Sequence, residues 1–423
     1  MIFLRTLFRR LENLLRIDLR YAISGGFFLT ATQVSSAVVA LGLTIAFANL
    51  LPVETYGMYR YVISVYGLLT IAALPGIDTA IIQAVSNGND AAFGEGLRAK
   101  LRWGLLGTGA ALILAGYEFY TGSEALGKVF ILAAIALPFM ESFSVYSAFL
   151  NGKKRYKEWA GIDIMTQVVS GASLVFSMLY SKSLFSLMVA YFVPYIVMRI
   201  GASFYVRRRL VENTNSDKGL FIYGRSMTLF QIISRLISSI DQIVLYHFLG
   251  PIQVAIFALA TAVPNRVQSV LRITGTLAFP KFANRTAQEI THSLPRKMFL
   301  FGLGILVVCG VYILAAPLMF TYIFPKYLPS LHFSQVAIFY TLSSITYPFG
   351  SYLFAHKKVQ ENYLIAVGSF IPKFLCLIIL VPRIGVWGAI IGLVATSLAT
   401  IGISIYLLIR DRRANTDTVS VSQ

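Results

Sequence analysis

Long stretches without any charged residue are the feature that most limits how this chain can fold. The first extends from Tyr21 to Val53, and comparable stretches recur to the C-terminus. About 20 apolar residues are enough for a helix to cross the hydrocarbon core of a bilayer. With 57% hydrophobic and only 13% charged residues among 423, the composition also departs from that of soluble globular proteins. We therefore expect an integral membrane protein and exclude a soluble enzyme.

The hydropathy pattern predicts an all-α membrane protein with twelve transmembrane helices. Several spans contain a proline, such as Pro75 in the second, which is compatible with either a kinked or an undisturbed membrane helix. The predicted spans are residues 21–50, 58–85, 103–120, 127–150, 159–180, 184–206, 220–248, 255–283, 298–321, 332–355, 362–381 and 384–409.

The basic residues are distributed unevenly between the two sides that these spans define. Seven segments on the side of the termini hold 26 of the 36 Lys and Arg residues, whereas the opposite loops hold four. Positively charged segments resist translocation, so this asymmetry predicts that both termini are cytoplasmic. The clusters are short and lie between apolar runs, which is not the pattern of a nucleic-acid binding surface. We expect no nucleic-acid partner.

The chain also has the organisation of two related halves. A shift of 198 residues aligns the turn at residues 49–59, after the first span, with residues 247–257, after the seventh. Six spans per half would make parallel repeats, and transporters bind substrate in the cleft between such halves. The predicted domains are an amphipathic surface helix at 1–20, an N-terminal lobe at 21–206, a cytoplasmic loop at 207–219, a C-terminal lobe at 220–409 and a cytoplasmic tail at 410–423.

Four basic residues lie near the middle of predicted spans, where they are too deep to reach the headgroups easily. They are Arg235, Arg266, Arg272 and Lys373. They are expected to face the interior of the bundle or water, either as ligands of an anionic substrate or in ion pairs that hold helices together. Arg60 and Arg199 lie nearer to span ends, where snorkelling to headgroups is the expected behaviour. Arg60 stays a candidate ligand because of its place after a turn.

Acidic residues inside the spans are candidates for ion coupling. Asp78, Glu141 and Asp241 lie within spans, whereas Glu118 and Asp163 lie near span ends that solvent can reach. A buried carboxyl group can carry a proton, or it can pair with a cation and have a purely structural role. Asp241 follows Arg235 by six positions, which is not a spacing that brings two side chains together on one helix.

Three short segments resemble those of Wzx-type polysaccharide flippases, and together they cover the chain from its first spans to its last. Residues 51–57 read Leu-Pro-Val-Glu-Thr-Tyr-Gly, which is similar to the turn after the first helix of that family. Residues 74–80 read Leu-Pro-Gly-Ile-Asp-Thr-Ala, and residues 382–389 read Pro-Arg-Ile-Gly-Val-Trp-Gly-Ala. The segment at 74–80 resembles a break in the family's second helix, and the segment at 382–389 resembles the turn into the family's last helix.

The resemblance implies a fold of twelve helices in two six-helix lobes around a central cavity, as in multidrug and toxin extruders (MATE) and lipid II flippases. It implies a cargo of undecaprenyl-pyrophosphate-linked oligosaccharide, such as an O-antigen unit, moved between leaflets of a bacterial inner membrane. A polysaccharide polymerase and a chain-length regulator would then be partners. No cofactor is implied.

Other functions fit the sequence less well. A membrane glycosyltransferase or polymerase would need catalytic carboxylates on an ordered external loop, and the loops are short and lack an Asp-x-Asp motif. A multidrug extruder of the same superfamily would favour an acidic or aromatic cavity for its cationic ligands. A channel would need a selectivity filter, and no such motif is visible.

The charge asymmetry yields a topology that can be tested directly. Reporter domains fused after residues 54, 124 and 326 should register as periplasmic, and those fused after 154, 215 and 358 as cytoplasmic. Paired alkaline phosphatase and fluorescent protein fusions would measure this. A single reversed loop would contradict the twelve-span topology.

Overall fold

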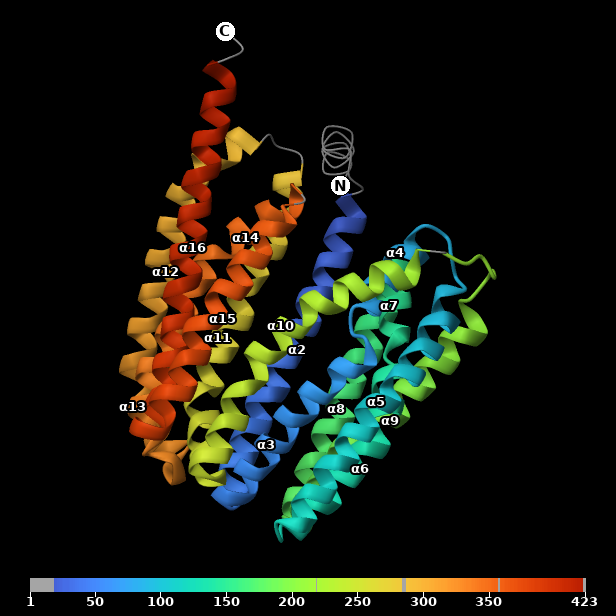
Figure 1. Ribbon diagram of the computed structural model, residues 1–423, viewed down its shortest axis with the longest axis vertical. Coiled ribbons are helices and arrows are strands. Elements are labelled where there is room, and N and C mark those ends of the chain that lie inside the picture. Colours follow the sequence, from blue (N-terminus) through green and yellow to red (C-terminus); the bar gives the residue numbers. More distant parts are fainter. Residues whose placement is uncertain (1–18, 218, 284–286, 357, 421–423) are drawn as a thin grey trace, which may run out of the picture.

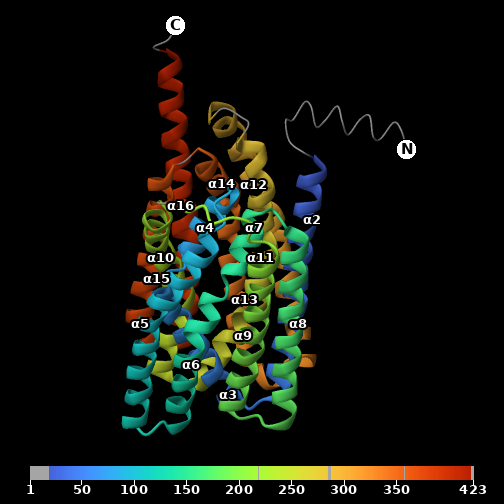
Figure 2. The same ribbon diagram turned by 90° about the vertical axis from the view of Figure 1, so that its right-hand side faces the viewer.

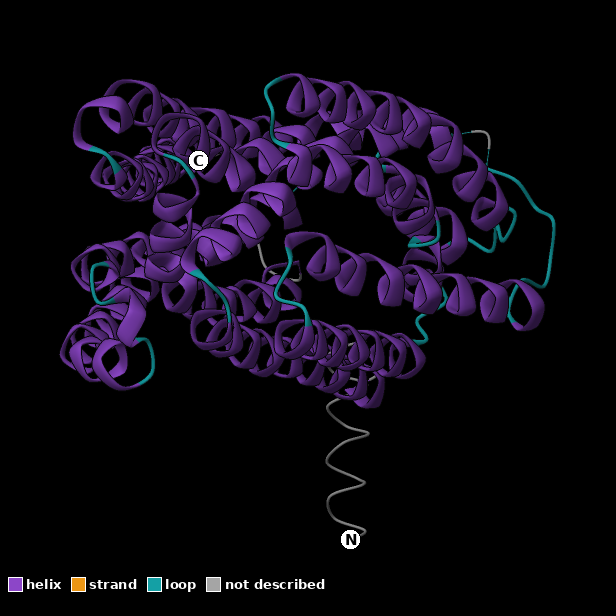
Figure 3. Ribbon diagram, turned by 90° about the horizontal axis from the view of Figure 1, so that it is seen from below, coloured by secondary structure: helices purple, strands orange, loops and turns teal. Residues whose placement is uncertain are grey.

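The computed structural model describes residues 19–217, 219–283, 287–356 and 358–420, and within these ranges every regular element is a helix (Figure 3). The predicted surface helix at 1–20 therefore lies almost entirely outside the described residues. The two ends of the described chain lie at the same end of the bundle (Figure 1). We call this the terminal end and the opposite one the distal end.

From residue 19 onward, the described part of the first half forms eight α-helices and one short 3-10 helix. They are α2 (Leu19–Leu50), α3 (Val53–Leu69), η1 (Thr70–Ala73), α4 (Ile77–Ser86), α5 (Ala92–Tyr120), α6 (Glu124–Ser142), α7 (Val145–Gly152), α8 (Tyr156–Tyr180) and α9 (Leu184–Arg209).

The second half forms seven α-helices and two 3-10 segments. They are α10 (Leu220–Leu249), α11 (Pro251–Ala283), α12 (Ala287–Tyr322), η2 (Pro325–Tyr327), α13 (Ser330–Ala337), η3 (Ile338–Thr346), α14 (Tyr347–Ala355), α15 (Val359–Ile384) and α16 (Val386–Ser420). The predicted tail thus begins as a continuation of α16.

The all-α membrane fold is confirmed, whereas the count of twelve crossings stays a prediction. Nine of the described helices are long and apolar enough to cross a membrane individually, and a bent pair of helices raises the number to ten. The remaining two predicted spans coincide with α5 and with the broken segment from α13 through η3 to α14.

The bent pair occupies the second predicted span, where a proline interrupts the helix. The helix from Val53 to Ala73 and that from Ile77 to Ser86 differ in direction by 52°. Pro75 lacks an amide hydrogen and disfavours the helical conformation for the residue before it. Leu74 accordingly adopts the left-handed conformation, with φ of 52°. The proline kink considered from the sequence is therefore present here.

Helix α10 connects the two lobes through side-by-side contacts as well as through the chain (Figures 1 and 2). Its first half packs against α4, where the amide of Gly76 donates a hydrogen bond of 3.1 Å to the Thr228 hydroxyl. Further along, α10 packs against α3 on one side and α15 on the other. The predicted loop between the lobes, at 207–219, is therefore followed by a helix, α10, that contacts both lobes.

The two turns aligned by the internal repeat meet each other at the distal end. Gly57, in the first turn of α3, lies against the start of α11 so closely that a Cβ atom on it would be 1.8 Å from the carbonyl oxygen of Pro251. Because the obstacle is backbone, a side chain at this position would have to push the two helices apart. The glycine is what permits α3 and α11 to touch.

Replacing Gly57 by leucine should therefore weaken the contact between the lobes. We expect a destabilisation of about 1–3 kcal/mol, as for other overpacked sites, measured by thermal unfolding of the purified protein. Gly42→Leu is the matched control, since a Cβ atom at Gly42 has no atom within 4 Å. Equal melting temperatures for the two variants would contradict the role of Gly57.

Candidate functional site

The lobes are in direct contact at the distal end, through aromatic and polar side chains. The rings of Tyr61 in α3 and Tyr246 in α10 stack with centroids 3.8 Å apart. Lys326, in η2, donates a hydrogen bond of 2.7 Å to the backbone carbonyl oxygen of Asn49. The side-chain amide of Asn49 donates in turn to the carbonyl oxygen of Ile323 at 3.0 Å. These contacts hold the two lobes together on the side away from the termini.

A polar cluster lies further along the same interface and involves Arg60. The amide of Gln242, in α10, is placed so that its oxygen accepts from Arg60 Nη2 at 2.7 Å, while its nitrogen donates to the Ser64 hydroxyl at 2.8 Å and to the Arg60 carbonyl at 2.9 Å. Arg60 therefore points across the interface and not toward the headgroups. The expectation that Arg60 snorkels is wrong, because a buried amide on the other lobe accepts from its guanidinium.

Arg235, on α10, also points toward the N-terminal lobe. Its Nη1 donates a hydrogen bond of 2.9 Å to the hydroxyl of Thr70, at the start of the break in the second span. Nearby, Gln231 Nε2 donates to the carbonyl oxygen of Pro75 at 3.4 Å. Side chains of α10 thus contact polar groups at both ends of the break in the second span.

Arg266 and Arg272 lie on α11, and polar neighbours surround them. Arg266 is half-buried and close enough to Arg60 for the two positive charges to repel, and Arg272 is exposed. The Tyr340 hydroxyl lies 2.5 Å from Asn265 Oδ1 and 2.7 Å from Gln268 Oε1. Exposed polar groups in the middle of a membrane helix are stable only where they meet water. We therefore expect this face of α11 to meet water.

None of the four arginines at the interface has a carboxylate within 4.0 Å in the described part of the chain. They are Arg60, Arg235, Arg266 and Arg272. A guanidinium keeps its charge at every accessible pH. The structure consequently gathers several uncompensated positive charges between the lobes.

Lys373 differs from these arginines because it is neutralised. Its ammonium group lies 2.7 Å from the carboxylate of Asp241, both side chains are almost fully buried, and it also donates to the carbonyl oxygen of Ile237. The pair joins α15 to α10. Of the two roles expected for Lys373, the structure shows the contacts of an internal ion pair.

The other two carboxylates proposed for ion coupling also have basic partners. Asp78 lies 2.6 Å from the Nζ of Lys100, whose side chain is completely buried and also donates to Ser144. Glu141 lies 3.9 Å from Nη1 of Arg199. Arg199 donates to the carbonyl oxygen of Met140 inside the lobe, so the expectation that it snorkels is wrong.

A polar cavity of about 190 Å³ lies within the N-terminal lobe, and Asp78 and Arg199 are part of its lining. Asp78 is the best-exposed of the three carboxylates, with 36% of its side chain accessible. Glu118, expected near solvent, is instead buried with only 6% exposed. The cavity is lined by side chains that include Asp78, Asp163, Arg199, Ser144, Tyr146 and Asn151.

Lys100 is a residue of these networks that the sequence analysis did not name as a candidate. Lys100 falls in a segment rich in basic residues, which led us to group it with the positively charged loops. A signal was nevertheless available, since Lys100 lies only three positions before the predicted third span, within reach of its buried face. Within the described ranges, no group of three or more His, Cys, Asp or Glu residues is arranged to hold a metal ion.

Comparison with known proteins agrees with this architecture. The profile of the family described as "Polysaccharide biosynthesis protein" matches residues 22–286, more than half of the chain. The chain belongs to this family. This membership agrees with the polysaccharide family that the three sequence segments resemble. No curated protein sequence matches the chain.

Solved structures share the fold at low sequence identity. An inward-facing MATE multidrug transporter of the MOP superfamily is 14% identical with a TM-score of 0.62, over 90% of this chain and 95% of the other. The lipid II flippase MurJ in an inward closed conformation is 14% identical with a TM-score of 0.63, over 91% of this chain and 87% of the other. These likenesses confirm the two-lobe, multi-pass membrane fold.

The contacts of Lys373 lead to a prediction about stability. Lys373→Ala or Asp241→Ala strands one buried charge and should cost about 3–5 kcal/mol, lowering the amount of folded protein in the membrane. The double variant removes both charges and should recover most of that loss. Fluorescence-detected gel filtration after heating would measure it.

Loss of the exposed pair formed by Lys128 and Glu124 is the matched control, and it should leave the amount of folded protein unchanged. If Lys373→Ala instead accumulated normally and failed only in transport, Lys373 would have to be returned to the substrate ligands.

Proposed function

We propose that the protein is a flippase for lipid-linked oligosaccharides in a bacterial inner membrane, with both termini in the cytoplasm. Its cargo would be an undecaprenyl-pyrophosphate-linked repeat unit of a surface polysaccharide, moved to the periplasmic leaflet by alternating access. The family description and the transporter fold support the general class.

The observation that carries the choice of cargo is the set of uncompensated arginines between the lobes. A diphosphate is costly to move through hydrocarbon unless fixed cations meet it. Guanidinium groups bind phosphate oxygens with paired donors. Arg60 lies near enough to Arg266 for the two positive charges to repel, and a diphosphate bound between them would reduce that repulsion. A cationic drug would increase it, which weighs against a multidrug extruder.

The contacts at the distal end support alternating access. Tyr61 and Tyr246, together with Gly57 and Pro251, join the lobes on that side. Access in this conformation would therefore be from the terminal end, where the positive-inside pattern places the cytoplasm. Lipid-linked units are expected to enter there and to leave after these contacts separate.

We keep Asp78 as the candidate for ion coupling among the three carboxylates. Its side chain is partly exposed in the N-terminal cavity, where an ion or proton could reach it. Asp241 is less suited, because only 8% of its side chain is exposed, against 36% for Asp78.

The proposal is tested in a strain that lacks the protein. Lipid-linked repeat units should accumulate on the cytoplasmic leaflet, while their synthesis continues. Supplying Arg266→Ala or Arg272→Ala should restore about tenfold less surface polysaccharide than the original protein does, because a charge-assisted hydrogen bond contributes about 1.5–3 kcal/mol. Lysine at either position should cost less, since it keeps the charge but loses the paired donors.

Surface polysaccharide is divided by the amount of the protein in the membrane, so that folding defects are not read as transport defects. Arg207→Ala, an exposed arginine in the last turn of α9, is the control and should behave as the original. Full transport by a variant with alanine at both Arg266 and Arg272 would rule out the cationic site. Unassembled sugars in the deletion strain would indicate an enzyme instead.

A further inference from the structure

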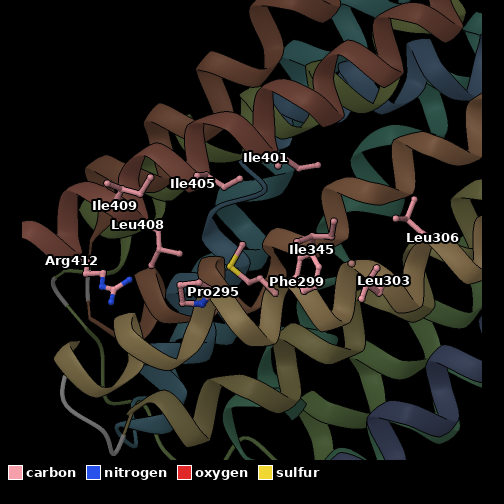
Figure 4. Close-up of a pocket in the computed structure, with 12 residues that line it drawn as sticks. Pro295, Phe299, Leu303, Leu306, Ile345, Ile401, Ile405, Leu408, Ile409 and Arg412 are labelled. Carbon is pink, nitrogen blue, oxygen red and sulfur yellow. The ribbon is translucent and has the colours of Figure 1, made fainter.

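A second site lies on the outer face of the C-terminal lobe, where α12 and α16 leave a groove between them (Figure 4). One wall comes from α12 and the other from α16, with Ile345 of η3 at the base. Nearly all of the lining is aliphatic or aromatic, and the arginine Arg412 closes one end. The side chains that define the groove include Phe299, Leu303, Leu306, Ile401, Ile405 and Ile345.

The groove has the depth of one leaflet. On α16 it runs from Ile401 to Arg412, which is about 16 Å of helix at 1.5 Å per residue. The hydrocarbon core of a bilayer is about 30 Å thick, so the groove covers half of it, at the terminal end. Its volume of about 490 Å³ corresponds to roughly sixteen groups of the size of a water molecule or methylene. These dimensions match a single acyl chain.

Positive charge gathers where the groove reaches the membrane surface. Arg412 lies at this mouth, and Arg296 and Lys297, both exposed, directly follow Pro295 of the groove wall. Each basic residue near the surface favours anionic lipid. The apolar length and the basic mouth together have the polarity of a phospholipid.

The last part of α16 is held firmly, which fixes the place of Arg412. Asp411 is bound by the Lys358 ammonium at 2.5 Å and also accepts from the Tyr352 hydroxyl at 3.4 Å. Arg410 bonds to Glu361 at 2.9 Å. The two residues before Arg412 are thus tied to α14, α15 and the loop between them, and Arg412 itself lines the end of the groove (Figure 4).

We propose that this groove binds one acyl chain of an anionic phospholipid from the leaflet at the terminal end, with the lipid phosphate meeting Arg412. The lipid would fill the space between α12 and α16 and join them. The site differs from the proposed cargo site, because the groove is lined by residues of α12, η3 and α16, whereas the interlobe arginines lie on α3, α10 and α11. A cargo bound by the interlobe arginines would have its diphosphate on a different face.

The experiment measures which lipids the full-length protein retains. The protein is reconstituted with equal amounts of phosphatidylglycerol and phosphatidylcholine, and bound lipids are counted by native mass spectrometry. We expect retained phosphatidylglycerol to exceed phosphatidylcholine by about fivefold. Arg412→Gln should reduce this preference severalfold, whereas Arg209→Gln, an exposed arginine at the end of α9, should leave it unchanged.

A second variant tests the groove without altering charge. Ile405→Trp fills the apolar channel and should reduce the number of tightly retained lipids by one. Leu314→Trp is the control, since Leu314 is on α12, 80% exposed and not part of the groove. Equal lipid retention by these two variants, or equal retention of the neutral and the anionic lipid, would overturn the proposal. So would recovery of a polyprenyl lipid from the groove in place of a phospholipid.

Discussion

The cost of an uncompensated charge inside a membrane is the constraint on which this structure depends. Three carboxylates within the helical core each face a basic side chain, as Asp241 faces Lys373 and Asp78 faces Lys100. The interlobe arginines do not follow this rule, although a charge at such depth is expensive. A structure that pairs these three carboxylates with bases and leaves the interlobe arginines uncompensated has the electrostatic form of an anion site. This contrast is a stronger argument for an anionic cargo than the total charge of the chain.

The same constraint explains how the lobes are joined. Helix α10 satisfies the polar groups that the broken second span exposes, through Thr228, Gln231 and Arg235. It also contacts α15 through the ion pair of Asp241. One helix thus serves both lobes, and any movement between them has to break hydrogen bonds on one of its sides. Backbone contact between Gly57 and Pro251 closes the distal end in a way that only a glycine permits.

The two binding surfaces that we propose use the same chemistry at different depths. The interlobe face offers guanidinium groups to a diphosphate within a hydrated space, and the outer groove offers Arg412 to a lipid phosphate at the membrane surface. Their separation on opposite sides of the C-terminal lobe means that one could be altered without the other. The lobe would then work as a body that a structural lipid stabilises while cargo passes along its inner face.

Much of the architecture was predictable from the sequence, because hydrophobic length and positive charge act locally. The apolar runs indicated the helices, Pro75 indicated a possible break, and the shift of 198 residues indicated corresponding turns in the two halves. That those turns touch each other was not predictable, since the alignment says nothing about the distance between them.

The sequence by itself determined that the chain is an all-helical membrane protein, and it identified the charged residues at membrane depth. It did not determine their roles. Lys373 and Arg266 look alike as basic residues in the middle of apolar spans, but Lys373 is 132 positions from the carboxylate that neutralises it. Pairing across such a separation depends on how helices pack, and a difference of a few ångströms decides whether a charge is compensated. Only the tertiary structure could therefore separate the structural lysine from the arginines that remain available to a ligand.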